Sequence, residues 1–145
     1  MKKIALIIAI AVLAAACAPQ AEPAPVAEAV VDAALSMSGK LEKAWSLEDL
    51  QALPATSADF TNKDGETTTY SGVSFADLFE SASVSDYASV NLIAADDYSI
   101  EVDQATLAAC ADCIIAIEDD GALRSVMPGM EGMFQVKDLV ALEIK

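Results

Sequence analysis

Cys110 and Cys113 are three positions apart in the sequence. Of all residues in this chain, this pair has the type and spacing best suited to a chemical role. Such a pair can form a structural disulfide, act as a redox-active dithiol, or stay free or bind a metal. We expect Cys110 to lie at the C-terminal end of a helix that begins at Asp103, with the carboxylate of Asp112 beside it. Negative charge in this position disfavours the thiolate that redox chemistry requires. The sequence therefore favours a structural disulfide, and the other uses remain as alternatives.

Carboxylates are the next candidates, because the chain contains no histidine, which is the commonest zinc ligand and general base. Asp96–Asp97 and Glu118–Asp120 carry the oxygen ligands that Ca²⁺ prefers. Neither run follows the alternating ligand pattern of an EF-hand loop, and we therefore expect solvated turns. We predict no metal site and no catalytic residue.

A methionine-rich segment near the C-terminus contains Met127, Met130 and Met133 between proline and glycine residues. Thioethers can bind Cu(I) or form an adaptable apolar contact with a partner. Methionines of this kind more often fill the core, but this loop is the best candidate for a functional surface. We predict that this irregular loop, together with Phe60 and Tyr98, forms a surface for a ligand or a partner.

The N-terminal segment is typical of an exported lipoprotein. Lys2 and Lys3 precede an apolar run, and three alanines stand directly before Cys17. This resembles the lipobox of bacterial lipoproteins, with Leu13 one position earlier than usual, and cleavage to a free soluble protein is the alternative. We predict a signal peptide over residues 1–16, a tether rich in proline and alanine over 17–34, and one domain over 35–145. The mature protein would be anchored through lipid on Cys17, at the periplasmic face of an outer membrane or the outer leaflet of a single membrane.

The charge of the chain limits its partners. Without Lys2 and Lys3, six basic residues stand against 23 acidic ones, a formal net charge of −17. Such a surface repels phosphate backbones and anionic headgroups, so we expect no binding to nucleic acid. Membrane attachment would then depend on acyl chains.

Turn and cap signals divide the predicted domain into short strands and helices. Ser46, Ser74 and Asp103 can each cap a helix, and Asp49 and Asp77 follow the two serines at the spacing of a capping box. Strands are expected at 35–41, 55–61, 66–70, 88–94, 98–102, 113–117 and 139–144, the second and third forming a hairpin. The predicted class is α+β, with a mainly antiparallel or mixed β core and short helices.

The order of several motifs resembles that of sulfite-oxidase-type molybdopterin-binding domains. The matching segments are Gly39–Lys40, Ser46–Leu50, Tyr70–Leu78, Ala95–Ser99, Ala116–Gly121 and Pro128–Ile144. The resemblance implies a sulfite-oxidase-like fold reduced to one small domain. In catalytic members a cysteine between the first helix and the Gly-Val turn ligates molybdenum, and the matching stretch, Ala58–Asn62, contains none. Members also hold the pterin phosphate with arginine and histidine, whereas Arg124 is the sole arginine of this chain.

These observations predict a lipid-anchored binding or accessory module of the cell envelope, without bound molybdenum and not an independent enzyme. Its partner would be another envelope protein or a small ligand. The alternative is an envelope oxidoreductase, either based on the Cys110 and Cys113 dithiol or retaining a molybdopterin cofactor, which the missing ligand disfavours.

Overall fold

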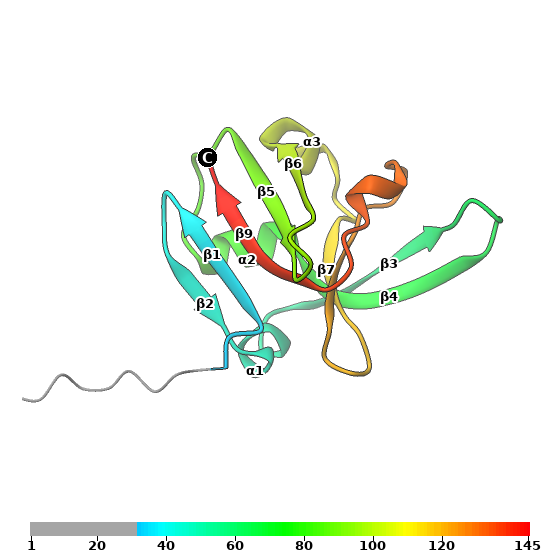
Figure 1. Ribbon diagram of the computed structural model, residues 1–145, viewed down its shortest axis with the longest axis horizontal. Coiled ribbons are helices and arrows are strands. Elements are labelled where there is room, and N and C mark those ends of the chain that lie inside the picture. Colours follow the sequence, from blue (N-terminus) through cyan, green and yellow to red (C-terminus); the bar gives the residue numbers. More distant parts are fainter. Residues whose placement is uncertain (1–31) are drawn as a thin grey trace, which may run out of the picture.

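The computed structural model describes residues 32–145, so the predicted signal peptide, Cys17 and most of the predicted tether lie outside the described residues. The described part folds into two β-sheets with short helices at their margins (Figure 1). The class is α+β, as predicted. No helix in residues 32–145 has the length and hydropathy needed to cross a membrane.

The first sheet has five strands and contains most of the core. Its order is β2 (Lys43–Trp45), β1 (Leu35–Gly39), β9 (Leu139–Ile144), β5 (Ser89–Ala94) and β6 (Ser99–Asp103). The β1 and β9 strands run parallel, and the other neighbours are antiparallel. This arrangement brings the C-terminal strand into the middle of the sheet, where Leu139, Leu142 and Ile144 are buried.

The second sheet has four antiparallel strands, in the order β3 (Ala55–Thr61), β4 (Thr67–Ser74), β7 (Ile114–Ile117) and β8 (Leu123–Val126). The β7 strand, within the strand expected at 113–117, is a run of apolar residues buried on both faces. The β3–β4 hairpin projects from the domain (Figure 1). Its turn is held by the Asn62 side chain, which accepts hydrogen bonds from the N–H groups of Asp64 and Glu66.

The helices begin where the cap signals predicted. They are α1 (Leu47–Gln51), α2 (Phe75–Ser81), α3 (Gln104–Ala109) and a single 3₁₀ turn, η1 (Gly132–Phe134). Ser46 forms a complete capping box with Asp49, and the Ser74 hydroxyl accepts a hydrogen bond from the N–H of Asp77. Asp103 caps α3 through the N–H of Thr106, at 2.7 Å.

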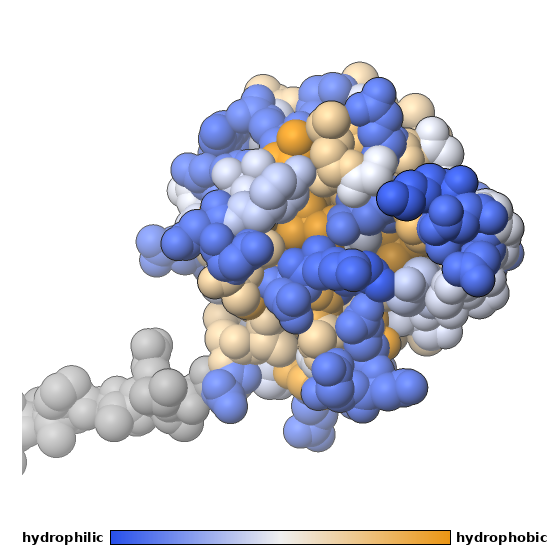
Figure 2. Space-filling view, turned by 45° about the vertical axis from the view of Figure 1, so that its right-hand side comes forward, coloured by the Kyte–Doolittle hydropathy of each residue, from blue (hydrophilic) through white to orange (hydrophobic). Residues whose placement is uncertain are grey.

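Two apolar clusters pack on the sheets. The larger one lies between them and includes Trp45, Leu78 and Leu142. The smaller one lies on the other face of the second sheet and consists of Ala58, Ile114, Ala116 and Val126, with Phe60 and Tyr70 packed against it. Figure 2 shows hydrophobic surface in the hollow between the projecting hairpin and the rest of the domain, surrounded by hydrophilic residues.

Some elements differ from those expected. The β2 and β8 strands were not predicted, and β4 continues to Ser74 although the sequence indicated an end near Tyr70. The β1 strand ends at Gly39, before the end expected at residue 41. The β8 strand was missed because its polar residues resemble a loop, whereas Ser125 is buried and bonded to the segment before β9.

Candidate functional site

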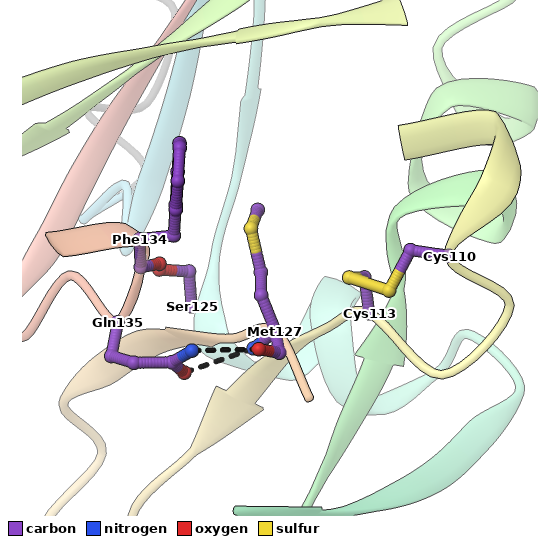
Figure 3. Close-up of a disulfide and its surroundings, with 6 residues drawn as sticks. All are labelled: Cys110, Cys113, Ser125, Met127, Phe134 and Gln135. Atoms are coloured by element: carbon purple, nitrogen blue, oxygen red, sulfur yellow. Dashed lines mark hydrogen bonds between the residues drawn. A yellow bond between two sulfur atoms is a disulfide. The ribbon is translucent and has the colours of Figure 1, made fainter. Parts of the chain in front are cut away.

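The predicted methionine surface is not formed as expected. Met127 has 0% exposure and belongs to the main core together with Cys113, so its prediction as a surface residue is wrong. The Gln135 side chain holds this position, because it accepts from the N–H of Met127 at 2.9 Å and donates to its carbonyl at 2.7 Å (Figure 3). Met130 is half-buried against the same core. The loop is therefore partly core filling.

Two other residues of the predicted surface do meet. Tyr98 is 43% exposed and Met133 is 47% exposed, and the Tyr98 hydroxyl donates to the Met133 carbonyl at 3.0 Å. Phe60 lies on β3 and packs against the smaller apolar cluster. Of the five predicted residues, Met127 is therefore excluded from an exposed surface, and a surface formed by the other four stays a prediction.

The predicted disulfide between Cys110 and Cys113 is present (Figure 3). Cys110 is the C-cap residue of α3, whose last turn contains no basic residue. Cys113 is 1% exposed and directly precedes β7. A reagent from solvent would therefore meet Cys110, and the buried sulfur of Cys113 would have to leave as a thiolate. Both features oppose thiol exchange, and the bond instead ties the end of α3 to the central strand.

A groove of about 600 Å³ lies between α2 and α3, beside the disulfide. Its walls include Phe75 and Phe79 of α2, Tyr87, Ala108 of α3 and Cys110. The aromatic rings pack edge to face, with centroids 6.0 Å apart for Phe75 and Phe79 and 5.1 Å apart for Phe79 and Tyr87. Burial raises the pKa of the Tyr87 hydroxyl above its usual value. The groove is thus mainly apolar, and Glu80 is the charged residue of its lining.

One local pattern on α2 could have indicated this groove. Phe75 and Phe79 are four positions apart on α2, and therefore share a helix face. The small residues Ala76, Ala108 and Ala111, which leave the space open, come from two distant segments. Only the folded chain shows that they face the same space.

The stretch that matches the metal-ligand segment of the resembled family lies on β3 and the turn that follows it. Ala58 is buried, and the Asp59 carboxylate accepts a hydrogen bond from the Thr69 hydroxyl at 2.5 Å. A hollow of about 290 Å³ lies along Ser57–Asp59 and is closed on its other side by Asp112 and Pro128. The ionisable residues of this lining are two carboxylates.

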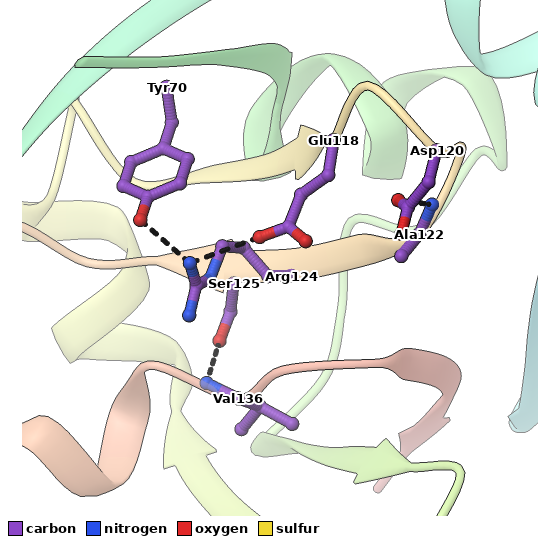
Figure 4. A network of polar contacts seen from close by, with 7 residues as sticks. All are labelled: Tyr70, Glu118, Asp120, Ala122, Arg124, Ser125 and Val136. Atoms are coloured by element: carbon purple, nitrogen blue, oxygen red, sulfur yellow. Dashed lines mark hydrogen bonds and ion pairs between the residues drawn. The ribbon is translucent and has the colours of Figure 1, made fainter. Parts of the chain in front are cut away.

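Arg124 does not supply the missing positive charge. Its Nη1 atom donates to the Tyr70 hydroxyl at 2.7 Å and pairs with Glu118 Oε1 at 3.0 Å (Figure 4). The guanidinium also stacks over the Tyr70 ring, 4.9 Å from its centroid. A pterin phosphate at the β3 hollow would face Asp59 and Asp112 instead of a cation, which is unfavourable. These residues do not fit a molybdopterin cofactor, and residues 32–145 contain no cluster of three or more His, Cys, Asp or Glu side chains that could hold a metal ion.

Comparison with known proteins supports the fold. No protein-family model matches the chain, and no curated protein matches its sequence. Among solved structures, the chain is similar to the sulfane dehydrogenase SoxCD from Paracoccus pantotrophus, with a TM-score of 0.63 and 18% identity. The match covers 76% of this chain and 37% of that one, so this chain spans well under half of its length. At this identity the similarity shows the fold alone, and it supports the distant sulfite-oxidase-like, oxidoreductase-type fold that the motifs predicted.

Proposed function

We propose that this chain is a lipid-anchored binding or accessory module of the cell envelope, which holds an apolar ligand in the groove between α2 and α3. The export and acylation signals at Cys17 support the location. The hollow beside β3 is lined by the carboxylates of Asp59 and Asp112 and by no cation, which favours binding over molybdenum catalysis. The fold then acts as a scaffold for recognition.

The groove is the observation that carries this function. Its volume of about 600 Å³ falls within the range of pockets that hold small ligands, about 300–1,000 Å³. Aromatic rings from α2 and Tyr87 form an apolar wall, and the disulfide fixes the end of α3 on the opposite side. A groove of this shape can take an apolar small molecule without a large rearrangement.

The rival function is that of a dithiol oxidoreductase using Cys110 and Cys113. It would need an accessible sulfur and a stabilised thiolate. Cys113 is buried, and Cys110 lies at the negative end of α3 beside Asp112. Titration of the reduced protein with a thiol reagent distinguishes the two functions, because a redox dithiol would react rapidly at neutral pH and a structural pair would react slowly.

Binding of the uncharged fluorescent probe N-phenyl-1-naphthylamine tests the groove. Ala108 and Ala109 are neighbouring exposed residues of α3, and only Ala108 belongs to the lining. Ala108→Trp should fill the groove and weaken probe binding by about tenfold, since steric exclusion removes most of the buried contact. Ala109→Trp adds the same side chain outside the groove and should leave the affinity unchanged. Equal affinities for the two variants would contradict the assignment of the site.

The anchor is tested separately in cells. The unmodified chain should incorporate labelled palmitate and appear in the membrane fraction. Cys17→Ser should abolish both, because the acceptor sulfur is lost. A Cys17→Ser chain that still takes up palmitate would show that the anchor has been wrongly assigned.

A further inference from the structure

One edge of the second sheet differs from the other sheet edges in residues 32–145. The β2 edge has three residues, and the β6 edge presents Glu101 and Asp103. The β8 edge is covered, because the Ser125 N–H donates to the Val136 carbonyl at 2.9 Å. The β3 edge has seven residues in continuous register with β4 and contains a single charged residue, Asp59. Long, regular edges of this kind are templates for pairing with another strand.

The hydrogen-bond pattern shows which groups of β3 point outward. The Asn62 N–H donates to the Glu66 carbonyl at 2.9 Å, which closes the hairpin. Because inward and outward groups alternate along a strand, the backbone of Ala58 and Phe60 faces β4, and that of Ser57, Asp59 and Thr61 faces away. Within the described residues, the N–H and C=O groups of these three outward residues have no hydrogen-bond partner. The edge can therefore accept an added strand.

The side chains beside this edge have a definite chemistry. Ala58 and Phe60 belong to the smaller apolar cluster, on one face of β3. Asp59 projects from the opposite face, since side chains alternate along a strand. Asp112 lies across the 290 Å³ hollow, and neither carboxylate forms an ion pair within residues 32–145. Figure 2 shows hydrophobic surface beside the hairpin with a hydrophilic rim.

We propose that the outer edge of β3 binds an extended, basic segment of a partner protein by strand addition. Apolar residues of that segment would cover the partly buried Phe60, and alternate lysines or arginines would face Asp59 and Asp112. Main-chain hydrogen bonds to Ser57, Asp59 and Thr61 provide the pairing, and side-chain alternation provides the selectivity. A second copy of this chain fits less well, because each copy carries a formal net charge of −15. This surface shares no lining residue with the groove between α2 and α3. An experiment can therefore detect peptide binding at β3 independently of ligand binding in the groove.

Two synthetic peptides test the partner chemistry on the whole purified protein. The first alternates lysine and valine, and the second has glutamate in place of lysine. The lysine peptide should bind, with an affinity that falls as salt is added, and the glutamate peptide should not. Amide hydrogen exchange should slow at Ser57, Asp59 and Thr61 when the lysine peptide is bound. Equal binding of both peptides, or protection only at other strands, would overturn the proposal.

Matched charge reversals test the position of the edge. Asp59→Lys and Asp64→Lys change the net charge equally, but Asp64 lies in the hairpin turn beyond the strand. Asp59→Lys should lower the affinity for the lysine peptide by about tenfold, and Asp64→Lys should lower it by less than about threefold. If Asp59→Lys does not fold, a lysine–valine peptide with methylated backbone nitrogens provides the test on the unchanged protein. That peptide should not bind, because it cannot form the main-chain ladder, and its binding would refute strand addition.

Discussion

Ser125 on β8 provides a sharp test of how the segment before β9 is held. Its side chain is fully buried, and its hydroxyl donates to the Phe134 carbonyl at 2.6 Å. The same hydroxyl accepts from the Val136 N–H at 2.8 Å (Figure 4). Ser125→Ala removes both bonds and leaves their backbone partners in place. We predict that this single change lowers the free energy of unfolding far more than a surface serine would.

The size of the expected stability loss follows from the two backbone groups, the Val136 N–H and the Phe134 carbonyl, that lose their hydrogen-bond partner. Val136 is buried, so its N–H loses its partner without gaining water, at a cost of about 1–3 kcal/mol. Phe134 is half-buried, so water can reach its carbonyl and the loss there is smaller. Together they amount to about 2–4 kcal/mol. For a domain of this size the expected fall in Tm is roughly 10 °C.

Chemical unfolding of the two proteins measures this difference directly. Urea denaturation followed by circular dichroism, with the fluorescence of the single tryptophan as a second probe, gives the free energies. Ser71→Ala is the matched control, because Ser71 is an exposed serine on the same sheet. It should change stability by less than about 0.5 kcal/mol. If Ser125→Ala lowered the free energy of unfolding as little as the control does, the hydrogen-bonding argument would be refuted.

Three further changes test other parts of the structure. Gly72→Ala should destabilise the fold by about 3 kcal/mol or prevent folding, because a Cβ atom there would lie 2.0 Å from the Ile115 carbonyl oxygen, and urea denaturation measures the loss. Burial raises the pKa of Tyr87 above its usual value of 10.0, so the folded state holds this proton more tightly than the unfolded state. Stability should therefore fall as the pH rises above 10, and thermal melts of Tyr87→Phe should show a smaller fall. Reduction of the disulfide between Cys110 and Cys113 should cost about 2 kcal/mol for its short loop, and a double alanine variant should not respond to reductant.

Local rules predicted much of the fold because the features that they describe are local. The capping box at Ser46 and Asp49 needs only four consecutive residues, and it forms as expected. The cap at Asp103 and the buried strand β7 follow from equally short segments. The spacing of Cys110 and Cys113 also indicated their disulfide correctly. In each of these cases the residues that decide the outcome are close together in the sequence.

The features that sequence reasoning missed depend on distant partners. The β8 strand resembles a loop until Arg124 pairs with Tyr70 from β4 and Ser125 bonds to Val136. Met127 looked available for a partner, but Gln135, eight positions later, holds its backbone while its side chain enters the core. A polar residue in a buried strand is stable only when such partners are present. No local pattern reveals them.

Arg124 explains why the fold and the chemistry of the resembled family can separate. A fold can persist at 18% identity because it depends on buried positions, turns and caps that many side chains satisfy. Binding an anion depends instead on the charge of a few residues. Here the only arginine, on β8, forms an ion pair with Glu118, directly after β7, and donates a hydrogen bond to Tyr70 of β4. The hollow beside β3 is left with two carboxylates, and the same position that would repel a phosphate therefore attracts a basic segment.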